Sequence, residues 1–312
     1  MISFSKMNNY VRPENKTLVF RAKVLGALRR FFDSRDFVEV ETPVRIVSPA
    51  PEEHIDCPLV PKSKLDYVSY PATDTYLRAS PELQMKKLLA AGMQRIYQIG
   101  PCFREGEVGS RHSSEFTMME WYRKGGSYID IKNDFSSLLT YLSNMLPEEK
   151  RLDKSVKTLS VREAYQLYAG WDPWEGKWDQ DRFDFDMATK IEMAFKEMGG
   201  GFFLMDYPPQ AASLAKISDK GDLVAERWEF YFDGIELANC FSELCDESEQ
   251  RERFEKAREA RRLLGEIDYP IDEEFLSSLE SIGSAAGVAL GVDRLVMAML
   301  GIGDIAAVKV TD

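Results

Sequence analysis

The stretch RIYQIGPCFREGEVGSRHSSEFTMMEWYR, residues 95–123, decides the fold of this chain. Apolar and polar residues alternate up to Arg104, a charged segment punctuated by glycines follows, and a second alternating run covers the end of the stretch. The pattern predicts two strands joined by a loop of about ten residues. Because side chains alternate along a strand, one face of the second strand carries two aromatic rings and a carboxylate, from Phe116, Met118, Glu120 and Tyr122.

The loop of this hairpin carries three cationic or titratable side chains, Arg104, Arg111 and His112. Guanidinium groups suit phosphate oxygens and an aromatic ring suits a base, so the hairpin fits a triphosphate nucleotide. A charged hairpin at the edge of a sheet would read the same way. The hairpin alone leaves both interpretations open.

Composition narrows the class of protein. The chain has 312 residues, with 40 Lys and Arg against 52 Asp and Glu, a net charge of −12. Such a charge argues against broad nucleic-acid binding. No apolar run is long enough to span a membrane and no signal peptide is evident, so we expect a cytoplasmic protein. Four cysteines without a CxxC pair, and only two histidines, predict reduced thiols and no zinc site.

Other segments predict the elements around the hairpin. Apolar residues at helical spacing predict a helix over residues 16–35, with a stripe of Leu18, Ala22, Leu25, Leu28 and Phe32. A short strand follows and stops at Pro43. Ser80-Pro81-Glu82 is typical of a helix start, and Gly92 of its end. Residues 127–200 are expected to be mainly helical, and no second domain is evident.

Residues 227–244, RWEFYFDGIELANCFSEL, predict a second hairpin that turns at Asp233-Gly234. A two-residue turn pairs residues across the strands as follows: Tyr231 with Glu236, and Glu229 with Ala238. Glu229 and Glu236 then lie on one face as diagonal neighbours. Two such carboxylates repel unless a cation separates them, and oxygen ligands suit Mg²⁺ bound with phosphates. Both could instead point into solvent. Glu243, next along the chain, could pair with a substrate ammonium.

The segment GVALGVDRLVMAMLG, residues 287–301, predicts a short strand followed by an apolar helix. Gly287 and Gly291 would let a ligand approach the backbone closely. Arg294 falls in the first helical turn, where positive charge opposes the helix dipole. A nearby anion would explain an arginine at this position.

The run DESEQRERFEKAREARR, residues 246–262, places opposite charges three and four residues apart. This spacing is typical of a solvated helix face. We expect no chemical role for it.

Three segments resemble, in this order, the three signature motifs of class II aminoacyl-tRNA synthetases. They are the helix and strand that end at Pro43, the segment from Phe103 to Tyr122, and the segment from Gly287 to Arg294. RHSSEFTMMEWY resembles the second motif of lysyl-tRNA synthetases, and GIELANCFSEL their glutamate segment. The resemblance implies an α+β fold, a class II catalytic domain with an antiparallel sheet flanked by helices. It covers residues 1–312 as one domain and leaves no room for an anticodon-binding domain.

A freestanding catalytic domain of this kind is similar to the family of elongation factor P lysine ligases. LRASPELQMKKLLAAG and PAPEEHID also look like that family, while Ala289 stands where lysyl-tRNA synthetases usually have glycine. The resemblance implies ATP and Mg²⁺ as cofactors and adenylation of lysine or (R)-β-lysine. It further implies transfer to a lysine of elongation factor P, a homodimer, and no tRNA or membrane partner.

Site roles follow from the resemblance, residue by residue. The catalytic residues would be Arg104 and Arg294. The amino acid would contact Ser80, Pro81, Glu82, Tyr122, Asn239 and Glu243. ATP would contact Arg104, Glu105, Gly106, Arg111, His112, Ser113, Phe116, Glu236, Leu237, Gly291 and Arg294. Glu229 and Glu236 would hold Mg²⁺. No side chain would act as a covalent nucleophile.

Two positions depart from the lysyl-tRNA synthetase pattern. The sequence Arg104-Glu105-Gly106-Glu107 replaces RNE, so the carboxylate expected to contact adenine is displaced by one residue or replaced by backbone. Ser113 stands where the family usually has asparagine.

Three other functions compete with the ligase. A minimal enzyme could charge tRNA, an inactive paralogue could bind a nucleotide or regulator, and a small-molecule ligase could resemble ammonia-dependent asparagine synthetase. The acidic charge disfavours the first. Retention of both arginines and both metal carboxylates disfavours the second. Glu243 beside Tyr122 suits a long cationic substrate better than aspartate.

Overall fold

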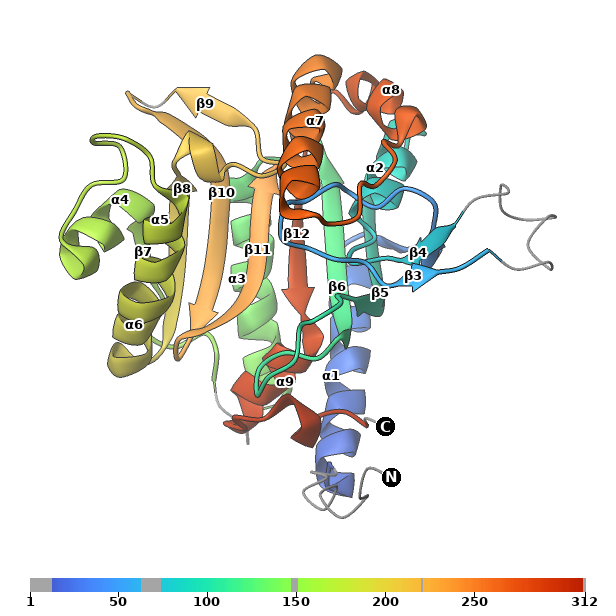
Figure 1. Cartoon of the computed structure of the whole chain (residues 1–312). Coiled ribbons are helices and arrows are strands. Elements are labelled where there is room, and N and C mark those ends of the chain that lie inside the picture. Colours follow the sequence, from blue (N-terminus) through green and yellow to red (C-terminus); the bar gives the residue numbers. More distant parts are fainter. Residues whose placement is uncertain (1–12, 63–73, 147–150, 220, 311–312) are drawn as a thin grey trace, which may run out of the picture.

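A nine-stranded sheet forms the centre of the molecule in a computed structural model that describes residues 13–62, 74–146, 151–219 and 221–310 (Figure 1). Eight strands follow the order β1-β5-β6-β12-β11-β10-β8-β7, and β9 pairs with β10. The pairs β1–β5 and β7–β8 are parallel, and the other pairs are antiparallel. The strands are β1 (Val38–Glu39), β5 (Arg95–Phe103), β6 (Glu115–Lys124), β7 (Lys157–Ser160), β8 (Gly201–Tyr207), β9 (Ile217–Asp219), β10 (Leu223–Phe232), β11 (Ile235–Ser242) and β12 (Ala285–Gly291).

Helices flank this sheet, and a small antiparallel sheet in the order β2-β4-β3 lies beside it. Its strands are β2 (Arg45–Ile46), β3 (Leu59–Val60) and β4 (Thr75–Leu77). The α-helices are α1 (Asn15–Asp33), α2 (Glu82–Ala90), α3 (Tyr128–Met145), α4 (Val161–Ala164), α5 (Gln180–Asp186), α6 (Glu192–Met198), α7 (Glu247–Leu264), α8 (Glu273–Ile282) and α9 (Val292–Leu300). The predicted α+β class with an antiparallel sheet is confirmed.

The two faces of β6 separate core from site. Met119 and Trp121 are fully buried in the main core, where Trp121 stacks on Phe135 of α3 and packs against Phe32 of α1. Alternate residues on the other face line a cavity. The sheet therefore buries its apolar face under α1 and α3, and its polar face lines the cavity.

The elements predicted from periodicity are found, with one rotation of a helix face. In α1 the fully buried residues include Val24, Leu28 and Phe31, whereas Ala22 of the predicted stripe is exposed and Leu25 is half-buried. The true buried face lies partly beside the predicted stripe. α2 begins at Glu82, whose backbone N–H donates to Ser80 Oγ at 3.0 Å. The region 127–200 is mainly helical as expected.

The pairing predicted for the second hairpin is wrong beyond the two residue pairs next to the turn. Tyr231 does pair with Glu236, but Phe230 pairs with Ala238, so Leu237 is an extra residue in β11. This bulge makes Glu229 pair with Asn239 instead of Ala238. A β-bulge flips the side-chain alternation of the strand that carries it. Glu236 and Asn239 can therefore both face the cavity, which a regular ladder would forbid.

The charged helix α7 is solvated along most of its length, with i,i+4 ion pairs such as Glu252–Lys256. Arg261 is an exception, because it is fully buried. Its guanidinium donates to the carbonyls of Glu52 and Ile55 and pairs with Asp56 at 2.6 Å. The expectation that this run is only a solvated face is wrong at Arg261, because Arg261 anchors the loop whose Glu52 and Ile55 line the cavity.

Among the described residues, no helix is long and apolar enough to cross a membrane. All four cysteines are free, and three of them are buried.

Candidate active site

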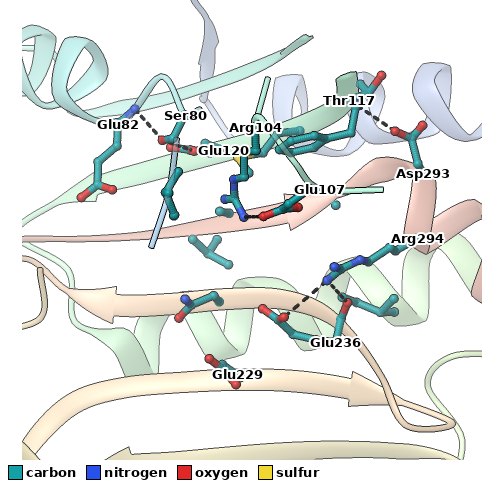
Figure 2. A pocket seen from close by; sticks show the side chains of 18 of the residues that line it. Ser80, Glu82, Arg104, Glu107, Thr117, Glu120, Glu229, Glu236, Asp293 and Arg294 are labelled. Atoms are coloured by element: carbon teal, nitrogen blue, oxygen red, sulfur yellow. Dashed lines mark hydrogen bonds and ion pairs between the residues drawn. The ribbon is translucent and has the colours of Figure 1, made fainter. Parts of the chain in front are cut away.

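A cavity of about 550 Å³ opens on the polar face of the sheet, between β6, β12, β11 and the loop after β5 (Figure 2). It brings together most of the residues that the sequence singled out. They are Ser80, Glu82, Arg104, Arg111, His112, Ser113, Phe116, Tyr122, Glu229, Glu236, Leu237, Asn239, Glu243, Gly291 and Arg294. Pro81, Glu105 and Gly106 are not among the lining residues, and Glu105 and Gly106 are exposed.

One end of the cavity is closed by a buried carboxyl group, Glu120 of β6. Its Oε1 accepts from Ser80 Oγ at 2.7 Å and its Oε2 accepts from Tyr122 Oη at 2.8 Å. Burial, and then the neighbouring Glu82, raise the pKa of Glu120 to about 7. Burial and Glu120 raise the pKa of Tyr122 well above its usual value, so this phenol stays protonated and donates. The group is thus fixed in orientation and titrates near neutral pH.

Two further carboxylates at this end share a lysine. Lys86 of α2 is fully buried and pairs with Glu82 Oε1 at 2.5 Å and with Glu243 Oε2. Burial alone would lower the pKa of Lys86, but Glu243 and Glu82 raise it well above its usual range. Burial raises the pKa of Glu243, and Lys86 opposes that rise. Lys86 is therefore a permanent cation behind two cavity-lining acids.

Gly287 of β12 allows this end to close. A Cβ at this position would lie 2.2 Å from the Tyr122 ring and 2.8 Å from Glu243 Oε1. The sequence pattern suggested that Gly287 admits a ligand to the backbone. In the structure the space beside Gly287 is taken by Tyr122 and Glu243, so this glycine shapes the pocket through its neighbours.

The opposite end is cationic. Arg104 follows β5 directly, and its guanidinium lies 5.3 Å from the centre of the Phe116 ring and 3.3 Å from Glu107 Oε1. Glu107, three residues after Arg104 in the same loop, also lines the cavity. An arginine and a ring side by side can contact a phosphate and a base, and a carboxylate can accept from an adenine amino group.

Arg294 ties the loop after β5 to β11. Its guanidinium donates to the Glu236 carbonyl at 3.1 Å and lies 3.3 Å from Glu236 Oε2, while its Nη2 lies 2.7 Å from His112 Nε2. Burial, and then Arg294, lower the pKa of His112, so the imidazole is neutral and accepts from the guanidinium. Figure 2 shows the Arg294 guanidinium directed at Glu236.

Glu229 and Glu236, the proposed metal ligands, lie on neighbouring strands β10 and β11 (Figure 2). Glu229 is held by Arg227 and by the Tyr231 hydroxyl, each at 2.5 Å. Burial, and then Glu229, raise the pKa of Glu236. Glu192 of α6 is also close, since burial and then these two carboxylates raise its pKa to about 7. The three carboxyl groups repel one another, although Arg227 pairs with Glu229 and Arg294 with Glu236.

These two carboxylates fit a magnesium ion bound with phosphates. The described part of the chain holds no cluster of three or more potential ligands from His, Cys, Asp and Glu. Mg²⁺ is commonly bound by one or two carboxylates, with substrate phosphates and water as its other ligands. The oxygen-only donor pair meets this requirement, and a cation would relieve the repulsion.

Several site residues escaped the sequence analysis. Arg227 orients two residues at once, since it donates to Asn239 Oδ1 at 3.1 Å and pairs with Glu229. Glu52 lines the cavity from the loop anchored by Arg261. Two signals were available: Arg227 stands two residues before Glu229 on one strand face, and Lys86 stands one helical turn after Glu82. Glu52 had no such signal.

Comparison with known proteins places the chain among synthetase-like enzymes. The family model of class II tRNA synthetases (D, K and N) matches residues 6–310. The elongation factor P–(R)-β-lysine ligase of Avibacterium paragallinarum is 36% identical, over 93% of each chain. Those of Proteus mirabilis and Erwinia tasmaniensis are 37% and 38% identical, over 91% of this chain and 91% and 90% of their own.

Proposed function

We propose a function for this chain, which belongs to the family of class II tRNA synthetases (D, K and N). It is an ATP-dependent ligase that adenylates (R)-β-lysine or lysine and transfers it to a lysine side chain of elongation factor P. Relatives that match over more than nine-tenths of their length carry the name of that activity. Use of ATP follows from the family.

The observation that carries the proposal is the charge division of the cavity. Three carboxyl groups, Glu82, Glu120 and Glu243, gather at the closed end, and Arg104 and Arg294 lie at the other. A diamino acid places its ammonium groups among the former and its carboxylate toward ATP at the latter. Aspartate would bring a second carboxylate to the acidic end, which disfavours the asparagine synthetase alternative.

Adenylation then needs positioning and charge stabilisation. The substrate carboxylate attacks the α-phosphorus, Arg104 stabilises the charge that develops there, and pyrophosphate leaves. Phe116 and Arg294 hold the adenine, and Arg111 with His112 lies near the outer phosphates. The amine of the acceptor lysine then attacks the adenylate carbonyl, and AMP leaves. No protein side chain forms a covalent bond.

Glu229 and Glu236 would hold Mg²⁺, which would supply positive charge to neutralise the charge that develops on pyrophosphate. Arg227 and Tyr231 keep Glu229 oriented for this role. Arg227 also holds Asn239, so the metal site and the amino-acid site share one positioning residue.

The assembly and partners belong to the same proposal. Residues 1–312 act as one catalytic domain, and two copies pair through α1, which exposes Ala22 and leaves Val19 57% exposed. The net charge of −12 opposes tRNA binding, so tRNA is not a substrate. Four free cysteines fit the reducing cytoplasm.

Exchange of labelled pyrophosphate into ATP tests the adenylation step. We expect (R)-β-lysine or lysine to support exchange, and aspartate not to support it. Charging of total tRNA, measured beside it with the same amino acids, should be absent. Exchange with aspartate alone would point to the asparagine synthetase alternative, and tRNA charging to a minimal synthetase.

A further inference from the structure

Lys86 is the one described cation that lies within 4 Å of both Glu82 and Glu243. Its side chain is 0% exposed and lies behind the cavity wall, so a substrate cannot touch it. Besides the two carboxylates, its ammonium faces the ring of Phe241 at 5.4 Å. A buried ammonium needs such partners, because an unpaired charge in the interior is strongly disfavoured.

The groups around this ion pair come from four segments. α2 supplies Lys86 and Glu82, and β6 supplies Glu120 and Tyr122. Glu243 and Cys245 follow the end of β11. Burial, and then Glu243, raise the pKa of the Cys245 thiol to about 11. Glu52, from the loop before β3, also senses the charge of Lys86. When Glu82, Glu120 and Glu243 are all ionised, the Lys86 ammonium offsets one charge and two negative charges remain at the closed end.

We propose that Lys86 is a positioning residue that acts as a built-in counter-ion, holding Glu82 and Glu243 as paired carboxylates and leaving the pocket matched to a substrate with two ammonium groups. This inference rests on the proposed function, since it explains how that site selects a diamino acid. Oε2 of Glu243 contacts the Lys86 ammonium, whereas Oε1 has no hydrogen-bond donor in the described part of the chain. Oε1 therefore remains available to the substrate ammonium.

The counter-ion has a consequence for pH. Burial raises the pKa of Glu243, and Lys86 holds that rise back. Without Lys86 the acid takes up a proton more readily, and a substrate ammonium must displace it. Loss of Lys86 should therefore weaken amino-acid binding most at low pH, and the deficit should shrink as the pH rises.

The variant Lys86→Met tests this, because methionine fills the space without charge. With (R)-β-lysine in pyrophosphate exchange, we expect KM at pH 7 to rise at least about 30-fold. The ratio of variant to wild-type KM should fall steadily between about pH 6.5 and pH 9, with kcat and ATP affinity nearly unchanged. Lys86→Arg keeps the charge, so its pH profile should stay with the wild type. If Lys86→Met does not fold, Lys86→Gln replaces it, and the same result is expected.

Lys87→Met is the matched control. Lys87 is the next residue of α2, and it pairs outside the cavity with Asp272 and Glu274, each at 2.8 Å. Its variant should keep the wild-type KM and pH profile. A loss in Lys86→Met that is equal at every pH, or is shared by Lys86→Arg, would show a merely structural role and overturn the inference.

Calorimetric binding of (R)-β-lysine to the same variants gives this comparison without turnover. Wild-type enzyme that binds neither lysine nor (R)-β-lysine and supports no exchange would instead refute the proposed function. If wild-type enzyme binds (R)-β-lysine and Lys86→Met binds it equally tightly at pH 7, only the role of Lys86 is refuted.

Discussion

Glu243 shows how one residue can be correctly singled out and still be incompletely understood. Its position directly after a predicted strand suited it to pair with a substrate ammonium. The structure adds Lys86 beside it, contributed by a helix more than 150 residues earlier in the chain. A pairing between distant segments has no local signal, so sequence reasoning could not find it.

The variant Glu243→Gln should greatly weaken use of the amino acid and spare ATP. Removing one charge of a buried pair with an ammonium should cost about 2–5 kcal/mol of binding free energy. KM for (R)-β-lysine and Kd for ATP separate the two effects. Glu247→Gln, on the surface of α7, serves as the control. An equal loss of ATP affinity would place Glu243 in the metal site instead.

Glu120 should make amino-acid binding depend on pH near neutrality. Its pKa is raised to about 7, so the carboxyl is partly protonated there and ionises as the pH rises. An ammonium prefers the ionised form, so 1/KM for (R)-β-lysine should increase through about pH 7. Glu120→Gln should flatten this rise in a profile from about pH 6 to pH 9. An unchanged profile would mean that Glu120 is not in contact with the substrate.

At the scale of elements, the two hairpins differ in how far the sequence determined them. Alternation placed Phe116, Met118, Glu120 and Tyr122 on one face of β6, and all four line the cavity. The Asp233-Gly234 turn fixed only the pairs next to it. The bulge at Leu237 depends on packing against neighbouring strands, which the turn residues do not encode. It decides the facing of Asn239, which was predicted from the resemblance and not from the register.

The loop after β5 shows a different limit. Its cationic residues were identified by charge, but the exposure of Glu105 and Gly106 depends on the path of an irregular loop. Glu107, which was not among the predicted ATP contacts, is the carboxylate of this loop that lines the cavity. Similarly, α7 looked solvated throughout because its spacing favours surface pairs. Arg261 is buried by the loop that folds over it.

The β10–β11 hairpin predicts a strict need for a divalent cation. Burial, and then Glu229, raise the pKa of Glu236, so the two carboxylates repel each other, and ATP phosphates beside them would add to this repulsion. Pyrophosphate exchange should therefore require Mg²⁺ or Mn²⁺, Glu236→Ala should abolish it, and Glu229→Ala should weaken it strongly. Glu255→Ala, on the exposed face of α7, should behave as wild type. Exchange that persists in EDTA would refute the metal site.

For the whole molecule, the exposed apolar side of α1 predicts a homodimer. Val19 is 57% exposed, Val38 of the adjoining strand is 51% exposed, and Leu18 and Leu25 are only half-buried. Apolar area of this kind is unfavourable on a solvated monomer. Sedimentation at micromolar concentration should give twice the chain mass of 35.7 kDa. Val19→Glu should shift the equilibrium toward monomer, and a wild-type monomer would contradict the prediction.

Acylation of elongation factor P by this enzyme can be followed by the intact mass of that factor. The enzyme, ATP, Mg²⁺ and elongation factor P are incubated with (R)-β-lysine or with lysine, and reactions without ATP or with Arg104→Ala serve as controls. We predict an added mass of one lysyl group that appears only with active enzyme and ATP. If neither amino acid adds that mass while pyrophosphate exchange proceeds, the acceptor is another molecule and the account is contradicted.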